Sequence, residues 1–261
     1  MEFTKNHIVE NNNKYIIFGQ IKDICTVIFS KFEIDTIKLD LSTTQFDNED
    51  YWTFEIDNKK INVICQKEHL KDNPKDKYIT ITEDSENYKN IILPYINNIY
   101  KANTKWIFDI LNKKTEIDKI LLNDTNFMII KDKIWADNTK KNFYVLAIPR
   151  LDIKTIRDLR SKHIDILLQM RDSCIKIASE HNINDNELYF FFHYHPSFYH
   201  LHLHCCIINH PSLTSKYFRC KMLDTVLVNL KHKSNYYRDC NIKFEIPEKH
   251  IIAKLLSKDN C

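Results

Sequence analysis

Residues 193–204 read HYHPSFYHLHLH and contain five of the chain's twelve histidines. His200, His202 and His204 alternate with apolar residues, so a β-strand over residues 200–208 would place these three imidazoles on one face of a sheet. The ordinary pKa of histidine is near ~6.5, so a neutral imidazole can offer a nitrogen lone pair to an electrophile or transfer a proton at neutral pH. The pattern therefore indicates a site built from histidine side chains.

The residue types leave three uses of this cluster open. A strand rises ~3.3 Å per residue, so the Cα atoms of His200 and His204 would lie ~13 Å apart, whereas zinc needs each ligand nitrogen at ~2.0–2.1 Å. No His-Glu-x-x-His motif or cysteine cluster accompanies the histidines, so a metal would need distant ligands. They could also be ordinary buried or surface side chains. We favour catalysis by imidazole itself, without metal or cofactor, in which a central histidine attacks phosphorus while its neighbours orient it or move protons.

The composition excludes two common ways of binding phosphate. The formal net charge is only +3, so the whole chain offers no polycation for duplex nucleic acid, and an anionic partner must be small or held by a local cluster. Gly19 is the only glycine, whereas a phosphate loop of the Walker or dinucleotide type needs several. Phosphate chemistry in this chain must therefore use side chains.

The start of the chain contains acids and asparagines where a signal peptide would have a basic end and an apolar stretch, and no later run approaches ~18 apolar residues. The eight cysteines are scattered and form no Cys-x-x-Cys pair. We therefore expect an intracellular protein with reduced thiols, in the cytoplasm, the nucleus or both, that does not enter a membrane.

The elements that must position the histidines begin with a strand-rich first part. Alternating apolar residues predict strands in KYIIFGQI, ICTVIF, FEIDTIKLDL, DYWTFEI and KINVICQ. Residues 83–114 then become helical, with Pro94 marking the start of a helix or a kink, and with apolar residues at 107, 110 and 111 on one buried face. We place the domain boundary in this helical stretch.

The second part mixes strands and helices and has no internal repeat. The pattern predicts strands over 118–123, 126–135, 142–149, 187–195 and 200–208, and helices over 161–182 and 215–233, before a short ending over 241–261. This order predicts an α+β fold. The predicted divisions are an N-terminal strand-rich lobe over 1–103, a helical connector over 104–114 and a C-terminal domain with an antiparallel sheet and helices over 115–261.

The segment HLHLHCC, residues 200–206, fits the His-φ-His-φ-His-φ-φ motif of the histidine triad superfamily, where φ is apolar. The longer HYHPSFYHLHLH resembles, within that superfamily, the scavenger mRNA decapping family, which typically reads His-Tyr-Leu-Pro-Ser-Tyr-Tyr-His-Leu-His-Val-His. The resemblance extends to YKNIILPYI at 88–96, KWIFDILNKKTEID at 105–118 and TIRDL at 155–159. It therefore covers roughly residues 65–261.

The resemblance implies a homodimer in which the N-terminal lobe is domain-swapped and the C-terminal domain carries the triad. Its implied reaction is hydrolysis of the 7-methylguanosine cap of short RNA fragments left after 3′-to-5′ mRNA decay, or of the cap dinucleotide, with release of 7-methylguanosine monophosphate and no need for a metal. It also implies that His202 attacks phosphorus to form a nucleotidyl-histidine, that His200 and His204 orient the ring and stabilise the oxyanion, and that His193 assists protonation of the leaving group.

The resemblance also implies three residues that bind the substrate, two of them at the methylated base. Methylation makes guanine cationic, and Trp106 occupies the position of the family's stacking residue, since indole is the best side chain to stack on a cation. Glu116 matches the acidic residue against the guanine edge, where a carboxylate accepts ring and amino protons. Asp132 matches the next acidic position. By residue type alone, Trp106 could equally be a core anchor and the two carboxylates solvated charges.

Further residues are implied for the phosphates, with departures from the family pattern. The family reads Asp-x-Lys-Trp where this chain reads DKIW, so the lysine is Lys133 or Lys131. Ser197 matches a serine that can hold a phosphate oxygen, and Arg219 matches a helix-borne arginine suited to two phosphate oxygens. Phe198 stands in place of a tyrosine. His195 replaces a leucine, and the residue pattern assigns it no purpose.

Two other functions compete with cap hydrolysis. The first is a general dinucleoside polyphosphate or nucleoside phosphoramidate hydrolase of the same superfamily, against which Trp106, Glu116 and the large N-terminal region argue. The second is a cap-binding protein that has lost catalysis, against which the complete triad argues.

Overall fold

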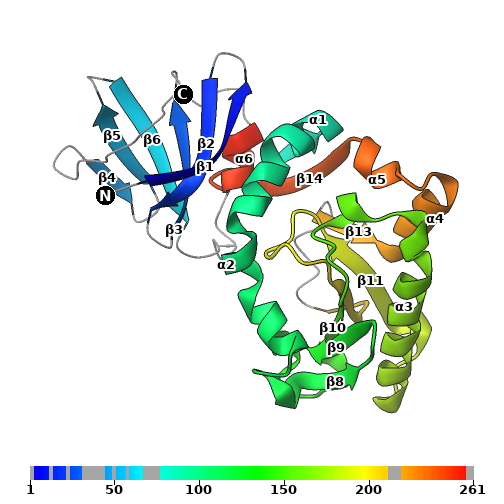
Figure 1. The fold of residues 1–261 in the computed structure, drawn as a ribbon. Coiled ribbons are helices and arrows are strands. Elements are labelled where there is room, and N and C mark those ends of the chain that lie inside the picture. Colours follow the sequence, from blue (N-terminus) through cyan, green and yellow to red (C-terminus); the bar gives the residue numbers. More distant parts are fainter. Residues whose placement is uncertain are drawn as a thin grey trace. The chain divides into compact units, whose positions relative to one another are not determined.

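The computed structural model describes residues 3–11, 14–21, 24–30, 45–48, 51–56, 59–66, 77–210 and 219–256. The chain divides into two compact units, one made of Met1–Lys101 with Ile246–Cys261 and the other of Ala102–Glu245. Figure 1 labels the elements of both. Among the described residues, no helix is both long enough and apolar enough to span a bilayer.

The first unit contains a six-stranded sheet in the order β1-β2-β3-β6-β5-β4, and each neighbouring pair is antiparallel. Its strands are β1 Phe3–Asn11, β2 Lys14–Ile21, β3 Ile24–Ser30, β4 Gln45–Asn48, β5 Tyr51–Ile56 and β6 Lys59–Gln66. The predicted strands in KYIIFGQI, ICTVIF, DYWTFEI and KINVICQ are confirmed, whereas β1 and β4 were not expected. The expected strand in FEIDTIKLDL lies outside the described residues.

A helical stretch follows strand β7, Tyr78–Glu83, as three consecutive segments: α1 Ser85–Asn87, the π-helical η2 Tyr88–Ile92 and α2 Leu93–Leu111. The π-helical segment comes directly before Pro94. Pro94 has no N–H and therefore cannot donate the α-helical hydrogen bond to the carbonyl of residue 90. Just before it, the Leu93 N–H donates to the Tyr88 carbonyl, five residues back, which is the π-helical pattern. The predicted helix is confirmed, and its residues 107, 110 and 111 are buried.

The end of the chain, Ile246–Cys261, groups with the first unit, whereas the sequence pattern placed it in a C-terminal domain over 115–261. Strand β14, Ile242–Pro247, pairs with β7 in a two-stranded sheet, and helix α6, Ile251–Leu256, contacts β7 and η2. The Glu248 N–H donates to the Lys77 carbonyl at 2.9 Å, and their side chains form an ion pair. These contacts join the described residues 246–256 to β7 and η2 of the first unit.

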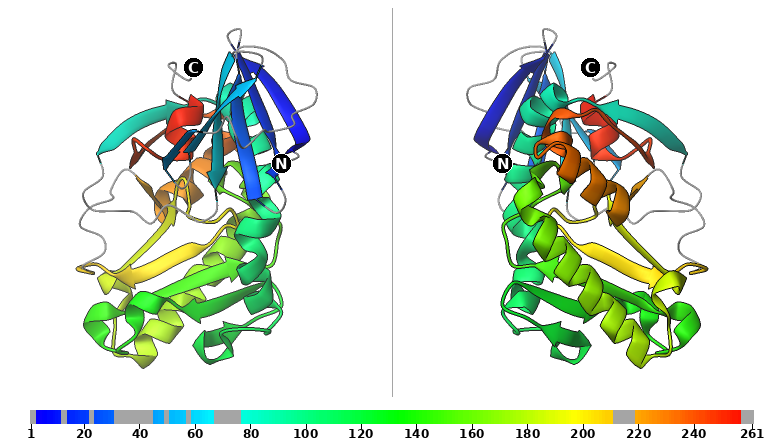
Figure 2. Two further views of the ribbon diagram at one scale, coloured as in Figure 1. Left: turned by 90° about the vertical axis from the view of Figure 1, so that its left-hand side faces the viewer. Right: turned by 90° about the vertical axis from the view of Figure 1, so that its right-hand side faces the viewer.

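The second unit contains a six-stranded antiparallel sheet in the order β13-β11-β12-β10-β9-β8. Its strands are β8 Ile120–Asn123, β9 Phe127–Lys131, β10 Tyr144–Pro149, β11 Leu188–His193, β12 Leu203–Ile207 and β13 Cys220–Met222. The helices are α3 Ile164–Glu180, α4 Leu223–His232 and α5 Tyr236–Asp239, with short 3₁₀ turns between elements. The views in Figure 2 show α3 lying along this sheet, and the α+β prediction is confirmed.

The two faces of this sheet have different partners. Helix α3 packs on β9, β10 and β12. The Cys205 side chain points to that helix, since it forms a hydrogen bond with Cys174 of α3. Alternation therefore places His204 on the opposite face. There it is paired across the strands with Leu146 of β10 and Phe191 of β11.

Three local predictions are wrong. Strand β12 begins at Leu203 rather than at residue 200, because the Leu201 N–H donates to the Ile153 carbonyl at 2.7 Å instead of joining the sheet. The DKIW segment is not strand, because the Asp132 side chain accepts the Ile134 N–H and caps the 3₁₀ turn η4, Lys133–Trp135. The helix expected over 215–233 is not continuous: Arg219 has 3₁₀ geometry, β13 follows it and pairs with β11, and α4 begins at Leu223.

Candidate active site

His202 is buried and has one ring nitrogen tied to the backbone. Its Nδ1 lies 2.8 Å from the carbonyl oxygen of His200, so this nitrogen carries a proton and donates it. In a neutral ring the other nitrogen, Nε2, must then hold a lone pair. Burial lowers the pKa of His202 to about 4, with repulsion from His200 and Arg219 adding to the shift and the backbone hydrogen bond opposing it. The ring is therefore neutral at neutral pH.

His200 supplies that carbonyl and has its own ring fixed. Its Nε2 donates to the Pro149 carbonyl at 2.8 Å, and the Phe108 ring lies edge-on to it at 5.5 Å. Burial lowers the pKa of His200, partly opposed by the Pro149 carbonyl and the charge of Asp152. These contacts fix His200, whose carbonyl oxygen accepts the hydrogen bond from His202.

His204 lies beside His202 and His193. The ring centroids of His204 and His202 are 4.7 Å apart, and those of His204 and His193 are 4.2 Å apart. Phe191 stacks on His204 at 5.0 Å and an interplanar angle of 3°. The Tyr144 hydroxyl lies 2.8 Å from its Nδ1. Burial, reinforced by the neighbouring histidines and Arg219, holds the pKa of His204 well below its usual range.

Arg219 brings a positive charge to these rings. Its charge lowers the pKa of both His202 and His204, and its side chain is 9% exposed. The Nε of Arg219 donates to the carbonyl of His195 at 2.9 Å, and its own carbonyl accepts the Tyr194 N–H. The guanidinium is therefore held by the main chain next to the histidines.

His195 is a buried packing residue. Its ring is 2% exposed and packs among aromatic side chains, stacked on Tyr194 at 4.1 Å and edge-on to Phe244 at 4.9 Å. Its carbonyl oxygen is the one that holds Arg219. The residue therefore packs within the unit and serves the site through its backbone.

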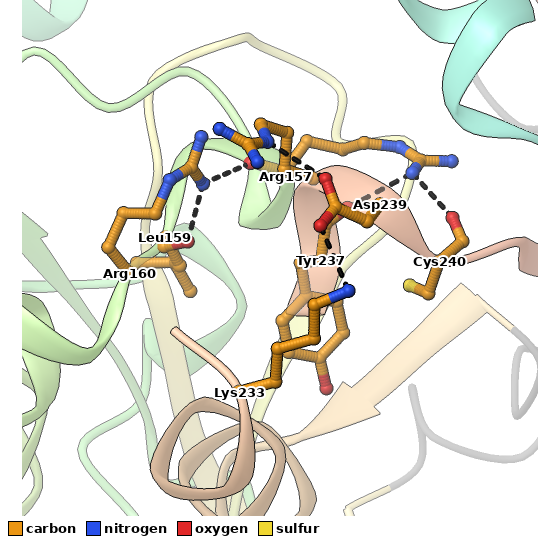
Figure 3. Close-up of polar contacts among 8 residues, drawn as sticks. Arg157, Leu159, Arg160, Lys233, Tyr237, Asp239 and Cys240 are labelled. Carbon is orange, nitrogen blue, oxygen red and sulfur yellow. Dashed lines mark hydrogen bonds and ion pairs between the residues drawn. The ribbon is translucent and has the colours of Figure 1, made fainter. Parts of the chain in front are cut away.

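A buried arginine, Arg157, bonds Tyr194 in the segment that carries His193 and His195. Arg157 is 1% exposed and donates from Nε to the Tyr194 hydroxyl at 3.1 Å, and from Nη1 to the carbonyls of Tyr237 and Cys240. Figure 3 shows its guanidinium reaching these carbonyls beside the ion pair of Lys233 with Asp239. Tyr194 lies between His193 and His195 in the sequence, so the hydrogen bond from Arg157 fixes the residue that connects these two histidines.

Trp106 reaches the histidines through Phe198. The indole is 36% exposed and lies edge-on to Phe198, with ring centroids 4.6 Å apart. Phe198 in turn stacks on His202 at 4.2 Å and 25°. Three aromatic rings thus run from a partly open indole to the buried imidazole.

Glu116 and Asp132 have local partners. Glu116 is exposed after α2, has a left-handed backbone with φ of 52°, and forms an ion pair with Lys119 at 3.1 Å. Burial raises the pKa of Asp132. Within the described ranges, no hydrogen bond, ion pair or ring contact joins Glu116, Asp132 or Lys133 to the triad histidines.

The two alternative lysines differ in their surroundings. Lys133 is exposed in η4. Lys131, at the end of β9, bonds the Asn138 side chain and places its ammonium 5.3 Å from the Trp135 ring centroid. Ser197 is exposed in the loop before His200.

Sequence reasoning missed Tyr144 and Phe191, which grip His204 from the two neighbouring strands. Both lie in predicted strands, but only the pairing register shows that they meet this histidine. In the part of the chain that the structure describes, no group of three or more histidine, cysteine, aspartate or glutamate side chains is arranged to hold a metal ion.

Known proteins resemble this chain in sequence. A family model described as "Scavenger mRNA decapping enzyme C-term binding" matches residues 105–217. An m7GpppX diphosphatase of Caenorhabditis elegans is 33% identical over 170 residues, which are 63% of this chain and 54% of that protein. An m7GpppX diphosphatase of Schizosaccharomyces pombe is 26% identical over 100% of this chain and 96% of that protein. A solved HIT family hydrolase from Legionella pneumophila Philadelphia 1 is 19% identical with a TM-score of 0.33, over 38% of this chain and 88% of that chain.

The chain spans about half the length of the Caenorhabditis elegans relative and nearly the whole length of the Schizosaccharomyces pombe relative.

Proposed function

This chain belongs to the scavenger mRNA decapping enzyme family, and from that membership we propose that it hydrolyses the 7-methylguanosine cap of short capped RNA fragments or of the cap dinucleotide. The observation that carries the proposal is the state of His202. Its Nδ1 is committed to the His200 carbonyl and its ring is neutral at neutral pH, so Nε2 offers a lone pair for attack.

The proposed reaction has two steps. His202 Nε2 forms a bond to the phosphorus that carries 7-methylguanosine, and the bond from this phosphorus to the bridging oxygen breaks. RNA or a nucleoside leaves with a terminal diphosphate, whose oxygen takes a proton from His193. Water then attacks the same phosphorus, gives its proton to His193, and displaces the ring nitrogen. Each cycle consumes one water and releases 7-methylguanosine monophosphate.

The neighbours of His202 support the charge that develops on the phosphoryl oxygens. Arg219 is a fixed cation close enough to lower the pKa of His202 and His204, and a preorganised cation of this kind stabilises an oxyanion without reorganisation. Ser197 is exposed in the adjoining loop and is proposed to hold a phosphate oxygen. His200 orients the nucleophile through its carbonyl.

The methylated base is proposed to stack on Trp106. The edge-on contact with Phe198 leaves the indole 36% exposed, so a cationic ring can approach it. Glu116 is proposed to bind the guanine edge, Asp132 to contact the substrate, and Lys133 or Lys131 to contact the phosphates. We also propose a homodimer with a swapped N-terminal lobe, located in the cytoplasm, the nucleus or both; these proposals rest on the family resemblance.

Hydrolysis of methylated cap dinucleotide in ¹⁸O-enriched water, with chelator present, tests the reaction and the attacked phosphorus together. We expect the label in 7-methylguanosine monophosphate and none in the nucleoside diphosphate, because water attacks the phosphorus held by His202. Label in the diphosphate would contradict this assignment. Equal rates with unmethylated dinucleotide would favour a general dinucleoside polyphosphate hydrolase, and binding without turnover would establish a cap-binding protein.

The variant His202→Asn tests the nucleophile. It keeps a polar side chain of similar size but removes the attacking nitrogen, so cap cleavage should fall at least about 10⁴-fold, as when other enzymes lose a catalytic nucleophile. The matched control is His232→Asn, which changes an exposed histidine at the end of α4 and should keep wild-type activity. Cleavage by His202→Asn at a wild-type rate would refute the mechanism.

A further inference from the structure

We infer that Tyr144 is a positioning residue that selects the tautomer of His204, so that Nε2–H of His204 is a ready donor to a phosphoryl oxygen beside His202. The inference rests on the proposed function for its catalytic part. The tautomer itself can be tested without any substrate.

The sheet brings the two side chains together across neighbouring strands. On β10 and β12, Leu146 pairs with His204 and Tyr144 pairs with Cys206, so Tyr144 is the diagonal neighbour of His204 on the same face. Its hydroxyl lies 2.8 Å from His204 Nδ1, and both residues are buried. On the opposite neighbouring strand, β11, Phe191 pairs with His204 and its ring stacks on the imidazole. This stacking keeps the imidazole in the orientation that meets the Tyr144 hydroxyl.

The surroundings of Tyr144 keep its hydroxyl protonated. Burial raises the pKa of Tyr144, and the charge of Asp132 and the nearby thiols of Cys206 and Cys220 raise it further. The ring of His210 lies on another side, edge-on at 5.2 Å. With the phenol protonated and His204 neutral, the hydrogen bond between them has two arrangements.

The two arrangements differ in what happens to the phenolic proton. Among the described residues, His204 Nδ1 is the hydrogen-bond partner of the Tyr144 hydroxyl. If His204 donated from Nδ1, the O–H of Tyr144 would be buried without an acceptor, which costs about 1–3 kcal/mol. If Tyr144 donates, this bond uses its proton. The favoured tautomer therefore has a bare Nδ1 and a proton on Nε2.

The Nε2–H that results has a use at the site. This nitrogen is buried and, within the described part of the chain, has no hydrogen-bond partner. Its ring lies beside His202 and His193, at centroid distances of 4.7 Å and 4.2 Å. A phosphoryl group bonded to His202 would bring oxygens into this region, and an oxygen that gains charge would satisfy the waiting donor. The other tautomer would present a lone pair to that oxygen and repel it.

The tautomer is read by NMR of the ¹⁵N-labelled wild-type protein, from the long-range couplings that distinguish a protonated Nε2 from a protonated Nδ1. We expect His204 to carry its proton on Nε2. In Tyr144→Phe, which keeps the ring and removes the hydroxyl, we expect a mixture of both tautomers. A merely structural role for Tyr144 would leave the tautomer unchanged.

Kinetics of the same variant test the catalytic part. An equal mixture of tautomers halves the fraction of protein with a proton on Nε2, so kcat for methylated cap dinucleotide should fall at least about twofold. KM should change little, because the donor acts on charge that develops in the transition state. The control is Tyr237→Phe, which removes another buried hydroxyl, bonded to Asn229 at 2.9 Å, and keeps the backbone carbonyl that Arg157 uses. Its kcat and the His204 signals should match wild type.

Two results would overturn the inference: a wild-type His204 protonated on Nδ1, or a Tyr144→Phe variant with unchanged tautomer and kcat. The first needs no variant, so a folding defect in Tyr144→Phe cannot shield the inference. If wild-type protein did not cleave the cap at all, the proposed function would fail, and the NMR spectrum would still decide the tautomer.

Discussion

Phe198 is the residue whose two contacts join base recognition to the nucleophile. One side of its ring stacks on His202, and Trp106 lies edge-on to it. Attack through Nε2 occurs in the plane of the imidazole, so a ring stacked on its face leaves that direction open. What the phenyl ring does is keep water from one face of His202, whose pKa is lowered mainly by burial.

The variant Phe198→Ala should therefore raise the pKa of His202 from about 4 towards 6.5, because water gains access to the imidazole and stabilises its charged form. An NMR titration of the His202 ring measures the change. Phe198→Tyr retains the aromatic ring at the position where the family has tyrosine, and its His202 should titrate as in wild type. An unchanged pKa in Phe198→Ala would show that this ring does not control the burial of His202.

Two helices of this chain, which has one glycine, end with another residue at the position that glycine usually takes. Both α2 and α3 end in a Schellman motif: the Lys113 and Lys114 N–H groups donate to the carbonyls of Ile110 and Asp109, and the Asn182 and Ile183 N–H groups donate to those of Ser179 and Ala178. The residue after each cap is left-handed, with φ of 57° at Lys113 and 58° at Asn182. Glycine usually takes this position, because other residues strain there.

Lys113→Gly should therefore stabilise the protein. Relief of the left-handed strain is worth about 1–2 kcal/mol, and the greater freedom of glycine in the unfolded chain removes about 0.5–1 kcal/mol of it. We expect the free energy of unfolding, measured with urea, to rise by about 0.5–1 kcal/mol. Asn182→Gly is the matched change at the end of α3 and should gain less, because asparagine tolerates this conformation. A loss of stability in Lys113→Gly would contradict this account.

The whole molecule buries several histidines in neutral form. Burial is the largest cause of a lowered pKa at each of five positions: His163, His200, His202, His204 and His210. In the unfolded chain these groups titrate near 6.5, so below that pH the unfolded state binds protons that the folded state does not. Asp132 acts in the opposite sense, because its pKa is raised in the fold.

Stability should therefore be full above about pH 6.5 and fall as the pH drops towards 4, the folded value for His202. Each proton taken up on unfolding lowers the free energy of unfolding by about 1.4 kcal/mol per pH unit. Urea unfolding between pH 7.5 and 4.5 measures the slope. His202→Asn removes one of these groups and should show a smaller slope than the wild type. A flat profile would refute the neutral burial of these histidines.

Residue patterns alone predicted which kinds of elements form and which chemistry they carry. Period-two alternation identified β2, β3, β5 and β6, and helical periodicity identified the buried face of α2, because both depend only on which residues avoid water. The spacing of the histidines indicated a histidine site. At DKIW and at residues 200–202 the same alternating pattern fits both a strand and a turn or loop. The predicted strand ends were therefore wrong at these two places.

The way the site is held depends on contacts between segments that are far apart in the chain. The Tyr144 hydroxyl meets His204 across 60 residues of chain, and the Arg157 guanidinium bonds the Tyr237 carbonyl across 80. Such contacts depend on strand register and on which backbone groups remain unpaired at the end of a sheet, and a periodic pattern encodes neither. The position of the Arg219 cation and the grouping of residues 246–261 with the first unit follow from packing, because each depends on partners far away in sequence.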